Sequence, residues 1–267
     1  HDMTKSTIFN VLRRTRRIWA IASIHGELDR INRLQAIISD KFIPGDRLLY
    51  LGNILGRGEN VKATVNSILA FRRNILSRRN MFIHDIVMLR GAQEEMWQRL
   101  MQLQFAINPA EVLEWMLDQG IGSTLAAYES SPGDAQSAIR QGPMAITRWT
   151  TKIRTAFQGA GHQEWLSSLK HAAWTSEGTV LFVNRGIDPE RPLDAQADVF
   201  WWGARAFTSI DTSYGGFNKV VRGFDPAAKG LEETPFTISM DSGCGRGGPL
   251  LGVCLNNEGQ VIDYIEL

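Results

Sequence analysis

Hydrophobic residues recur with two alternating periods along the first hundred positions. Short apolar runs typical of buried strands occupy residues 17–22, 48–51 and 82–89. Each run is followed by apolar residues at helical spacing, over residues 27–39, 61–77 and 94–104. Strands separated by helices of this length favour right-handed βαβ crossovers, so we expect a largely parallel sheet.

The middle of the chain has no strand pattern. Short helical stretches alternate with breaks that contain glycine or proline, and Asn108-Pro109 and Ser131-Pro132 are helix-start signals. We therefore interpret residues from about 101 to 172 as a helical insertion within a single domain that covers residues 1–267.

The last third alternates apolar runs with turns and is predicted to be rich in strands. The runs occupy residues 179–184, 218–222, 235–240, 250–255 and 260–265. Asn256-Asn257-Glu258-Gly259 separates the last two, and asparagine and glycine tolerate the positive φ of tight turns. This loop predicts a β-hairpin at the C-terminal end.

Composition narrows the possible partners and location. The 267 residues include 29 Lys+Arg and 28 Asp+Glu, which gives a net charge of +1 and argues against a nucleic-acid partner. No apolar run approaches the roughly 18 residues of a membrane span, so we expect no membrane association. Two cysteines exclude a disulfide framework, and no signal-peptide pattern follows the arginine-rich start. These features predict a cytoplasmic protein.

Glycine-marked loops follow several of the predicted strands, and they are expected to form one site. They are residues 23–26, 52–58, 90–94 and 184–186. Ligands of open α/β sheets bind beyond the carboxyl ends of the strands, so these loops should converge.

These loops resemble the motifs of the metallophosphoesterase (calcineurin-like) superfamily, in its phosphoprotein phosphatase and symmetrical diadenosine tetraphosphatase branch. The chain reads Ser-Ile-His-Gly at 23–26, Gly-Asn-Ile-Leu-Gly-Arg-Gly at 52–58, Arg-Gly-Ala-Gln-Glu at 90–94, Asn-Arg-Gly at 184–186 and Arg-Gly-Phe at 222–224. Family members read Gly-Asp-x-His-Gly, Gly-Asp-x-x-Asp-Arg-Gly, Arg-Gly-Asn-His-Glu, His-Ala-Gly and a late Gly-His. The resemblance runs from about Arg17 to the C-terminus. It implies an α/β four-layer sandwich, with two mixed sheets flanked by helices and carrying the helical insertion.

The residues at the family's metal-binding positions differ in this chain. Ser23, Asn53, Ala92, Asn184 and Phe224 stand where the family has metal ligands, and only His25 keeps its type. Gln93 stands at the catalytic histidine. A two-metal phosphoesterase needs hard ligands around cations about 3.5–4 Å apart. An amide cannot protonate a leaving group. We expect no catalytic residue, no metal and no cofactor.

Arginines are retained or added in the same loops. Arg57 and Arg90 match arginines with which the family holds phosphate, and Arg185 adds a cation. Guanidinium groups bind phosphate through paired hydrogen bonds without metal. The expected residual anion pocket consists of Ser23, His25, Asn53, Arg57, Arg90, Gln93, Asn184, Arg185 and Phe224.

The leading hypothesis is a pseudophosphatase, a regulatory or protein-interaction module that binds an unidentified protein partner or a phosphorylated ligand. Its alternatives are a phosphoprotein phosphatase or dinucleoside tetraphosphatase with weak or unconventional metal-dependent hydrolysis, and a structural subunit of an assembly. At the residue level, Arg57 and Arg90 could instead bond to loop carbonyls or to acids such as Asp29 and Glu94. The glycine-rich segment 241–248 is interpreted as a tight structural loop.

Overall fold

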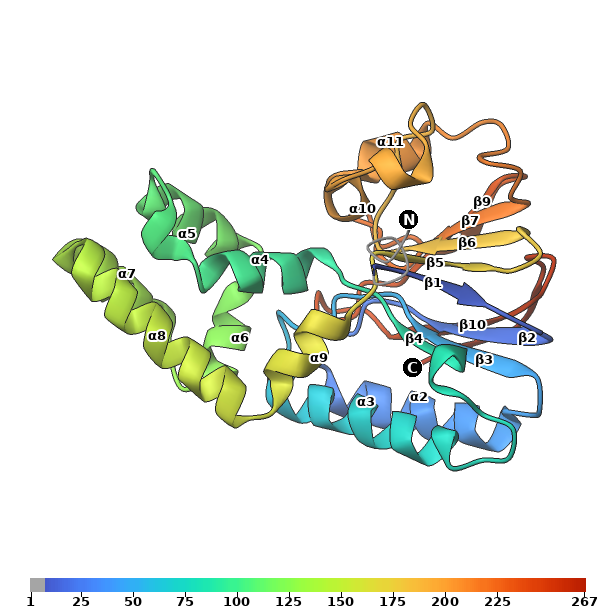
Figure 1. Cartoon of the computed structure of the whole chain (residues 1–267), viewed down its shortest axis with the longest axis horizontal. Coiled ribbons are helices and arrows are strands. Elements are labelled where there is room, and N and C mark those ends of the chain that lie inside the picture. The colour runs from blue at the N-terminus through green and yellow to red at the C-terminus, as the bar shows by residue number, and fades with distance from the viewer. Residues whose placement is uncertain (1–7) are drawn as a thin grey trace, which may run out of the picture.

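The computed structural model describes residues 8–267 and contains two sheets packed face to face, with helices on their outer faces (Figure 1). The first sheet has the order β11-β10-β2-β3-β4. Its strands are β2 (Arg17–Ile21), β3 (Asp46–Tyr50), β4 (Ile86–Met88), β10 (Leu251–Asn256) and β11 (Val261–Glu266). The second sheet has the order β1-β5-β6-β7-β9-β8. Its strands are β1 (Phe9–Leu12), β5 (Ala172–Thr175), β6 (Val180–Val183), β7 (Lys219–Arg222), β8 (Gly230–Glu233) and β9 (Thr237–Asp241).

Alternation along each strand divides the core into layers. In β2, Ile18 and Ala20 belong to the cluster between the two sheets. Trp19 and Ile21, which point to the other side of the strand, pack with α2 (Leu28–Lys41) and α3 (Val61–Leu76). Helices α10 (Val199–Trp202) and α11 (Ala204–Thr208) cover the second sheet. The four-layer α/β sandwich expected from the sequence is confirmed.

Both sheets are mixed. β2, β3 and β4 run parallel, as the βαβ pattern predicted, whereas β10 pairs antiparallel with β2 and with β11. The predicted hairpin joins β10 to β11, and Gly259 takes a φ of 89° in its turn.

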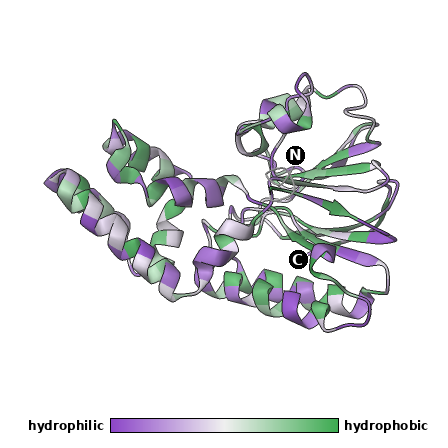
Figure 2. Ribbon diagram, viewed as in Figure 1, coloured by the Kyte–Doolittle hydropathy of each residue, from purple (hydrophilic) through white to green (hydrophobic). Residues whose placement is uncertain are grey.

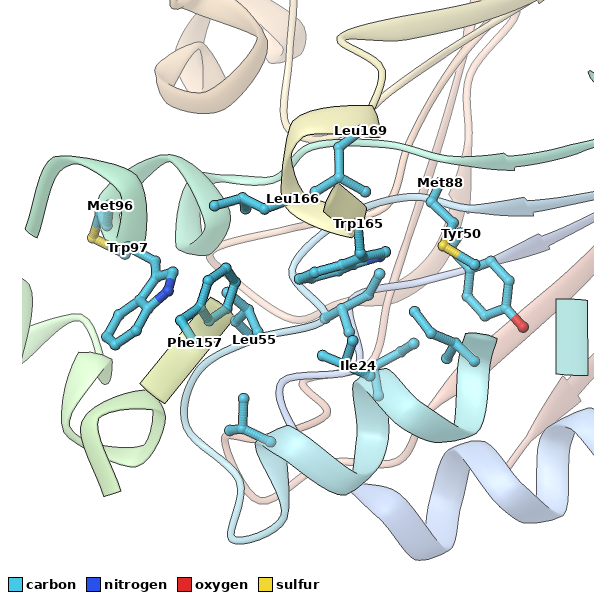
Figure 3. Packing of buried hydrophobic residues seen from close by; sticks show 14 of the residues in the cluster. Ile24, Tyr50, Leu55, Met88, Met96, Trp97, Phe157, Trp165, Leu166 and Leu169 are labelled. Carbon is cyan, nitrogen blue, oxygen red and sulfur yellow. The ribbon is translucent and has the colours of Figure 1, made fainter. Parts of the chain in front are cut away.

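Helices fill the middle of the chain and extend away from the sheets (Figure 1). They are α4 (Ala92–Leu100), η2 (Leu103–Phe105), α5 (Pro109–Asp118), α6 (Ile121–Ala127), α7 (Pro132–Gln141), α8 (Pro143–Gly159) and α9 (His162–Ser168). Their apolar faces join the core beneath the first sheet. Figure 3 shows Tyr50 of β3 and Trp165, Trp97 and Phe157 of the helices within one cluster.

Three short strands were not predicted. β1, β5 and β8 have four residues each, and β8 (Gly-Leu-Glu-Glu) is largely polar and lies at a sheet edge. The predicted strand at 82–89 is shorter, because Ile83–Asp85 forms the 3-10 helix η1, in which the Asp85 carboxylate accepts the Phe82 N–H at 2.9 Å. A further 3-10 helix, η3, covers Leu193–Ala195.

The hydropathy of the ribbon follows these layers: the strands are mainly hydrophobic and most helices carry both kinds of residue (Figure 2). Across residues 8–267, no helix has both the length and the apolar character of a membrane span.

Candidate functional site

The glycine-marked loops meet at the carboxyl ends of the strands. The N–H groups of Ile24 and His25 donate to the Asn53 carbonyl at 3.0 and 2.8 Å, which joins the loops after β2 and β3. Ser23 Oγ donates to the Gly223 carbonyl at 2.8 Å, across to the loop after β7 in the second sheet. The site therefore lies where the two sheets meet.

A buried carboxylate organises the loop after β3. Glu94 accepts the N–H groups of Asn53, Ile54 and Leu55 at 2.8, 3.1 and 3.1 Å, and that of Gly91 at 2.8 Å. Burial raises the pKa of Glu94, and these N–H donors oppose the rise. Glu94 thus bonds to backbone and makes no ion pair with Arg90, the contact that the sequence left open.

Asn53, at the position of the family's bridging carboxylate, has both ends of its amide bonded. Its Nδ2 donates to Ser23 Oγ at 3.2 Å, and its Oδ1 accepts the Gln93 N–H at 3.0 Å. The Asn53 amide therefore links its own loop to the segments that follow β2 and β4, without a cation.

Asn184, at a family histidine ligand, repeats this arrangement. Its Oδ1 accepts the Ala92 N–H at 3.2 Å and its Nδ2 donates to the Leu51 carbonyl at 2.8 Å. Both atoms that could face a metal are therefore bonded to the protein.

His25 is buried and uncharged. Its Nδ1 lies 2.8 Å from the Cys244 carbonyl, which makes Nδ1 the protonated nitrogen. Burial lowers the pKa of His25 to about 3, and the charges of Arg57 and Arg246 add to the effect. A single neutral imidazole next to two positively charged guanidinium groups does not favour the binding of a metal cation.

Non-glycine residues of the cluster hold left-handed backbone conformations. His25, Asn53 and Arg57 have φ values of 50°, 53° and 54°. Such conformations cost on the order of 1–3 kcal/mol each outside glycine, although asparagine tolerates them better. The hydrogen bonds of these loops offset that cost.

Arg90 is buried and bonded to the protein through its guanidinium group. Its Nε donates to Glu95 at 2.6 Å, and its remaining nitrogens donate to the Leu166 carbonyl at 3.2 Å and to Gln98. Its donors are occupied by α4 and α9, so the structure does not bring Arg90 together with the other predicted anion-binding arginines.

Arg57 and Arg185 have no such partners. Within residues 8–267 neither guanidinium makes a hydrogen bond or ion pair, and the Nε atom of each is buried without an acceptor. Burial lowers the pKa of both, with neighbouring arginines adding to it. Arg185 Cζ lies 4.8 Å from the centre of the Phe224 ring.

Arg246 joins this group and was not among the predicted site residues. Its Nη2 donates to Asp241 at 2.6 Å and to the Asp225 carbonyl at 3.0 Å, its Cζ lies 4.6 Å from the Phe224 ring, and its Nε has no acceptor. An arginine within the glycine-rich segment 241–248 was the available signal. Gly245, at φ 83°, lets that segment approach closely, because a Cβ there would lie 2.4 Å from His25 Cβ.

The donors at the site do not fit two divalent cations. No group of three or more His, Cys, Asp or Glu side chains in the described part of the chain could hold a metal. The amide oxygens of Asn53 and Asn184 already accept N–H groups, and Phe224 offers no donor. The chemistry of the donor set therefore disagrees with the two-metal site that the fold implies.

A pocket adjoins Arg57 between the sheet loops and the helical insertion. It has a volume of about 390 Å³. Its lining comprises Arg57, Leu117, Gly120, Gly122, Ser123, Pro132 and Gly245. The walls come from α5, α6, the start of α7 and the glycine-rich segment.

Comparison with known proteins places the fold. No family model and no curated protein matches the chain. Among the solved structures that match, a putative diadenosine tetraphosphatase has a TM-score of 0.54 and 18% identity, over 96% of this chain and 97% of that one. A cold-active protein-tyrosine phosphatase from a psychrophilic Shewanella species has a TM-score of 0.51 and 15% identity, over 100% and 85%. At these identities the likeness concerns the fold: the chain has the metallophosphoesterase-like, calcineurin-like fold that its motifs predicted.

Proposed function

We propose that the chain is a non-catalytic protein of the metallophosphoesterase fold that binds a phosphorylated ligand without metal and serves as a regulatory or protein-interaction module. The observation that carries the proposal is that the guanidinium groups of Arg57 and Arg185 make no hydrogen bond or ion pair within residues 8–267. Two cations without a counter-charge favour an anion that supplies both charge and acceptors.

The absence of catalysis follows from two substitutions. Asn53 provides no bridging anion, and its amide oxygen accepts the Gln93 N–H at 3.0 Å. Gln93 Nε2 donates to the Gln119 carbonyl at 2.6 Å, and an amide has no proton to give a leaving group at neutral pH. Activating a water at pH 7 needs metals that lower its pKa from roughly 15.7 to about 7.

The electrostatics of the site favour an anion. In the family this place combines carboxylates with metal ions. Here the charged groups around Phe224 are arginines, and the acids nearest to them, Asp241 and Asp225, are paired with Arg246 and Arg222 at 2.6 and 3.3 Å. Bidentate guanidinium contacts suit phosphate oxygens.

Calorimetry with inorganic phosphate tests the binding. We expect heat of binding that is the same with and without EDTA, and at least about tenfold weaker affinity in the double variant Arg57→Ala/Arg185→Ala, since each lost charge-assisted hydrogen bond contributes about 1.5–3 kcal/mol. Arg33→Ala, on the exposed side of α2, is the matched control. Absence of heat in the unchanged protein would exclude phosphate binding.

Turnover distinguishes the enzymatic alternative. We expect no nitrophenol from nitrophenyl phosphate in the presence of Mn²⁺, and no stoichiometric metal in the purified protein. Two bound metals together with turnover would establish a metal-dependent phosphatase instead.

A further inference from the structure

We propose that the end of the first sheet opposite to the glycine-marked loops is a docking surface for an acidic segment of a protein partner. This surface, the amino-end face, comprises residues 13–16, 43–45 and 78–84, which precede β2, β3 and β4. In Figure 1 it lies on the side away from the helical insertion. The inference goes beyond the proposed function, because the anion site lies at the carboxyl ends of the same strands.

The three segments of the amino-end face lie side by side. β2, β3 and β4 pair in parallel, so the segments that precede them meet at one edge of the sheet. The Arg16 N–H donates to the Gly45 carbonyl at 2.9 Å, which joins the first segment to the second. Buried Arg47 joins the first to the third, because its Nη2 donates to the Arg13 carbonyl at 2.8 Å and its Nε lies 3.1 Å from Asp85 Oδ1 in η1. The face is therefore one continuous surface with a buried ion pair beneath it.

The segments of the amino-end face contain five arginines and no acidic residue. Arg78 donates to carbonyl groups at the C-terminal end of α2, at 2.8 and 3.2 Å. The other four are exposed and make no side-chain hydrogen bond or ion pair within residues 8–267: Arg13, Arg14, Arg16 and Arg79. The flanking acids are engaged below the surface, Asp46 with Arg17 at 2.6 Å and Asp85 with Arg47 at 3.1 Å. Guanidinium groups bind carboxylates through paired hydrogen bonds, so the face is suited to an acidic partner.

The same segments expose three large apolar side chains. Ile43, Phe82 and Ile83 are 41%, 67% and 53% exposed, although residues of these types are most often buried. Protein interfaces combine an apolar centre with a polar rim, and they are enriched in aromatic residues and arginine. The amino-end face has this composition, so it fits a partner segment that carries both carboxylates and apolar side chains.

A protein segment fits this face better than a membrane or a nucleic acid. Three partly exposed side chains supply less apolar burial than one acyl chain, and a single acyl chain by itself gives only marginal, reversible membrane binding. Interfaces with nucleic acid are more polar than those between proteins, and they would leave Ile43, Phe82 and Ile83 without a contact. An acidic protein segment uses both the charge and the apolar surface.

The test begins with phage display, because the partner is unidentified. Random peptides are selected for binding to the full chain in phosphate-free buffer. We expect the selected peptides to be rich in Asp and Glu and to contain aromatic or aliphatic residues. Their affinity, measured by fluorescence polarisation, should fall as the NaCl concentration rises, since salt screens exposed charges.

Charge-reversed variants locate the bound peptide. Arg13→Glu/Arg79→Glu reverses two exposed, unbonded cations and is expected to weaken binding at least about tenfold, the loss that accompanies one charge-assisted hydrogen bond. Arg33→Glu/Arg148→Glu makes the same change in net charge at exposed positions of α2 and α8. This control is expected to leave the affinity nearly unchanged.

A second pair of variants tests the apolar contact. Phe82→Ser is expected to weaken the selected peptides about three- to tenfold, because apolar surface that the peptide covers is lost. Phe105→Ser removes the same side chain from η2, where it is 80% exposed, and should leave the affinity unchanged.

Several results would overturn the proposal. They are failure to select any peptide, selected peptides without acidic residues, an equal loss of affinity in the two charge-reversed variants, and tighter binding to phosphatidylserine vesicles or to oligothymidylate than to the selected peptides. Arg57→Ala/Arg185→Ala should bind the peptides as the parent does; a loss there, with Arg13→Glu/Arg79→Glu unaffected, would place the peptide at the anion site. Because phosphate binding is measured separately, either proposal can fail while the other stands.

Discussion

At the scale of single residues, the site shows how amides take over the structural role of carboxylates and metals. A carboxylate only accepts hydrogen bonds, whereas the amide of Asn53 donates to Ser23 Oγ and accepts from the Gln93 N–H. Asn184 does the same between Ala92 and Leu51. The substitutions that remove the metal ligands therefore also supply the bonds that hold the loops together.

Restoring a single ligand should destabilise the protein. Asn53→Asp loses the Nδ2 donor and places a carboxylate beside buried Glu94, whose Oε1 accepts the Asn53 N–H at 2.8 Å. We expect a loss of about 1–3 kcal/mol in the free energy of unfolding by urea. Mn²⁺ should not recover it, because the other ligands are absent. Asn74→Asp, exposed on α3, is the control. Recovery of stability by Mn²⁺ would contradict the metal-free interpretation.

His25 gives the stability a defined pH dependence. Its pKa is about 3 in the folded protein and about 6.5 when unfolded, so between these values only the unfolded state binds the proton. Stability is therefore greatest above pH 6.5 and falls as the pH drops toward 3. His162, whose pKa burial lowers to about 4, acts in the same direction.

The contribution of His25 is measured by the slope of stability against pH. From pH 6 to pH 4.5, His25→Gln should reduce the slope by about 1.4 kcal/mol per pH unit, the value for one proton. His84→Gln, at an exposed histidine, is the comparison variant. Identical slopes in the His25 variant and the parent would mean that His25 is not buried neutral.

Sequence patterns at the residue scale identified which loops form the site but not where each arginine points. Arg90 and Arg57 both match family positions, yet Arg90 is bound by Glu95 of α4 while Arg57 has no acid within reach. Arg246 lies far from both in sequence, and the glycine-rich segment 241–248 places it at the site. Such directions depend on tertiary neighbours, which local spacing does not encode.

At the scale of elements, the turn between α5 and α6 is part of the site. The Gln119 carbonyl accepts Gln93 Nε2 at 2.6 Å, and Thr124 Oγ1 accepts the Gly56 N–H at 3.1 Å. These bonds tie the insertion to the loops that follow β3 and β4. Periodicity predicted helices here, but nothing local indicated that their connection would contact the site.

Gly120 offers a direct test of this connection. In Gly120→Ala, the new Cβ would lie 2.5 Å from Arg57 Cγ at a φ of +94°, so Arg57 must move. We expect phosphate affinity to fall about three- to tenfold and stability to fall by about 1 kcal/mol or more. Gly161→Ala has a comparable left-handed backbone, with φ 78° and ψ 16° against 94° and 14° at Gly120, and no atom lies within 4 Å of the new Cβ. This control should lose comparable stability and keep its phosphate affinity; a loss of affinity in both would contradict the role of Gly120.

The sequence predicted best those helices and strands in which apolar residues recur regularly over the whole element. α2, α3 and the strands β2, β3 and β10 bury one or both faces in the main clusters, and their sequences alternate accordingly. β1 and β5 are four-residue strands that pair in parallel although the helical insertion separates them in sequence, and Phe9 lies opposite Ala172. Strands of this kind are determined by long-range pairing, and their own residues give a weak signal.

At the scale of the whole molecule, a net charge of +1 conceals a concentration of positive charge where the sheets meet. Motifs and periodicity predicted the four-layer architecture and the position of the site at the carboxyl ends of the strands. The reversal of charge at that end follows from the substitutions, because Ser23, Asn53 and Asn184 replace anionic or metal-binding groups while Arg57 is retained and Arg185 is added.

This concentration of charge opposes stability in the absence of a ligand. Burial lowers the pKa of Arg185, and repulsion from Arg222, Arg246 and Arg57 lowers it further. Residues that favour binding commonly reduce the stability of the free protein. Arg185→Met keeps an apolar side chain over Phe224 and removes the charge. Without phosphate, we expect its thermal midpoint to exceed that of the parent.

Phosphate should reverse the order of the two thermal midpoints, so that the parent becomes more stable than Arg185→Met. A ligand at about 100 times its Kd stabilises the folded state by about 2.7 kcal/mol, and one kcal/mol corresponds to about 2–4 °C for chains of about 150–250 residues. The parent midpoint should therefore rise by roughly 5–10 °C with EDTA present, and that of Arg185→Met by much less, so that the two curves change order. Sodium chloride at equal ionic strength should leave the order unchanged, since screening weakens repulsion without supplying acceptors. If Arg185→Met were the less stable protein without phosphate, the arginine would be a structural cation, and the ligand would not be needed to explain it.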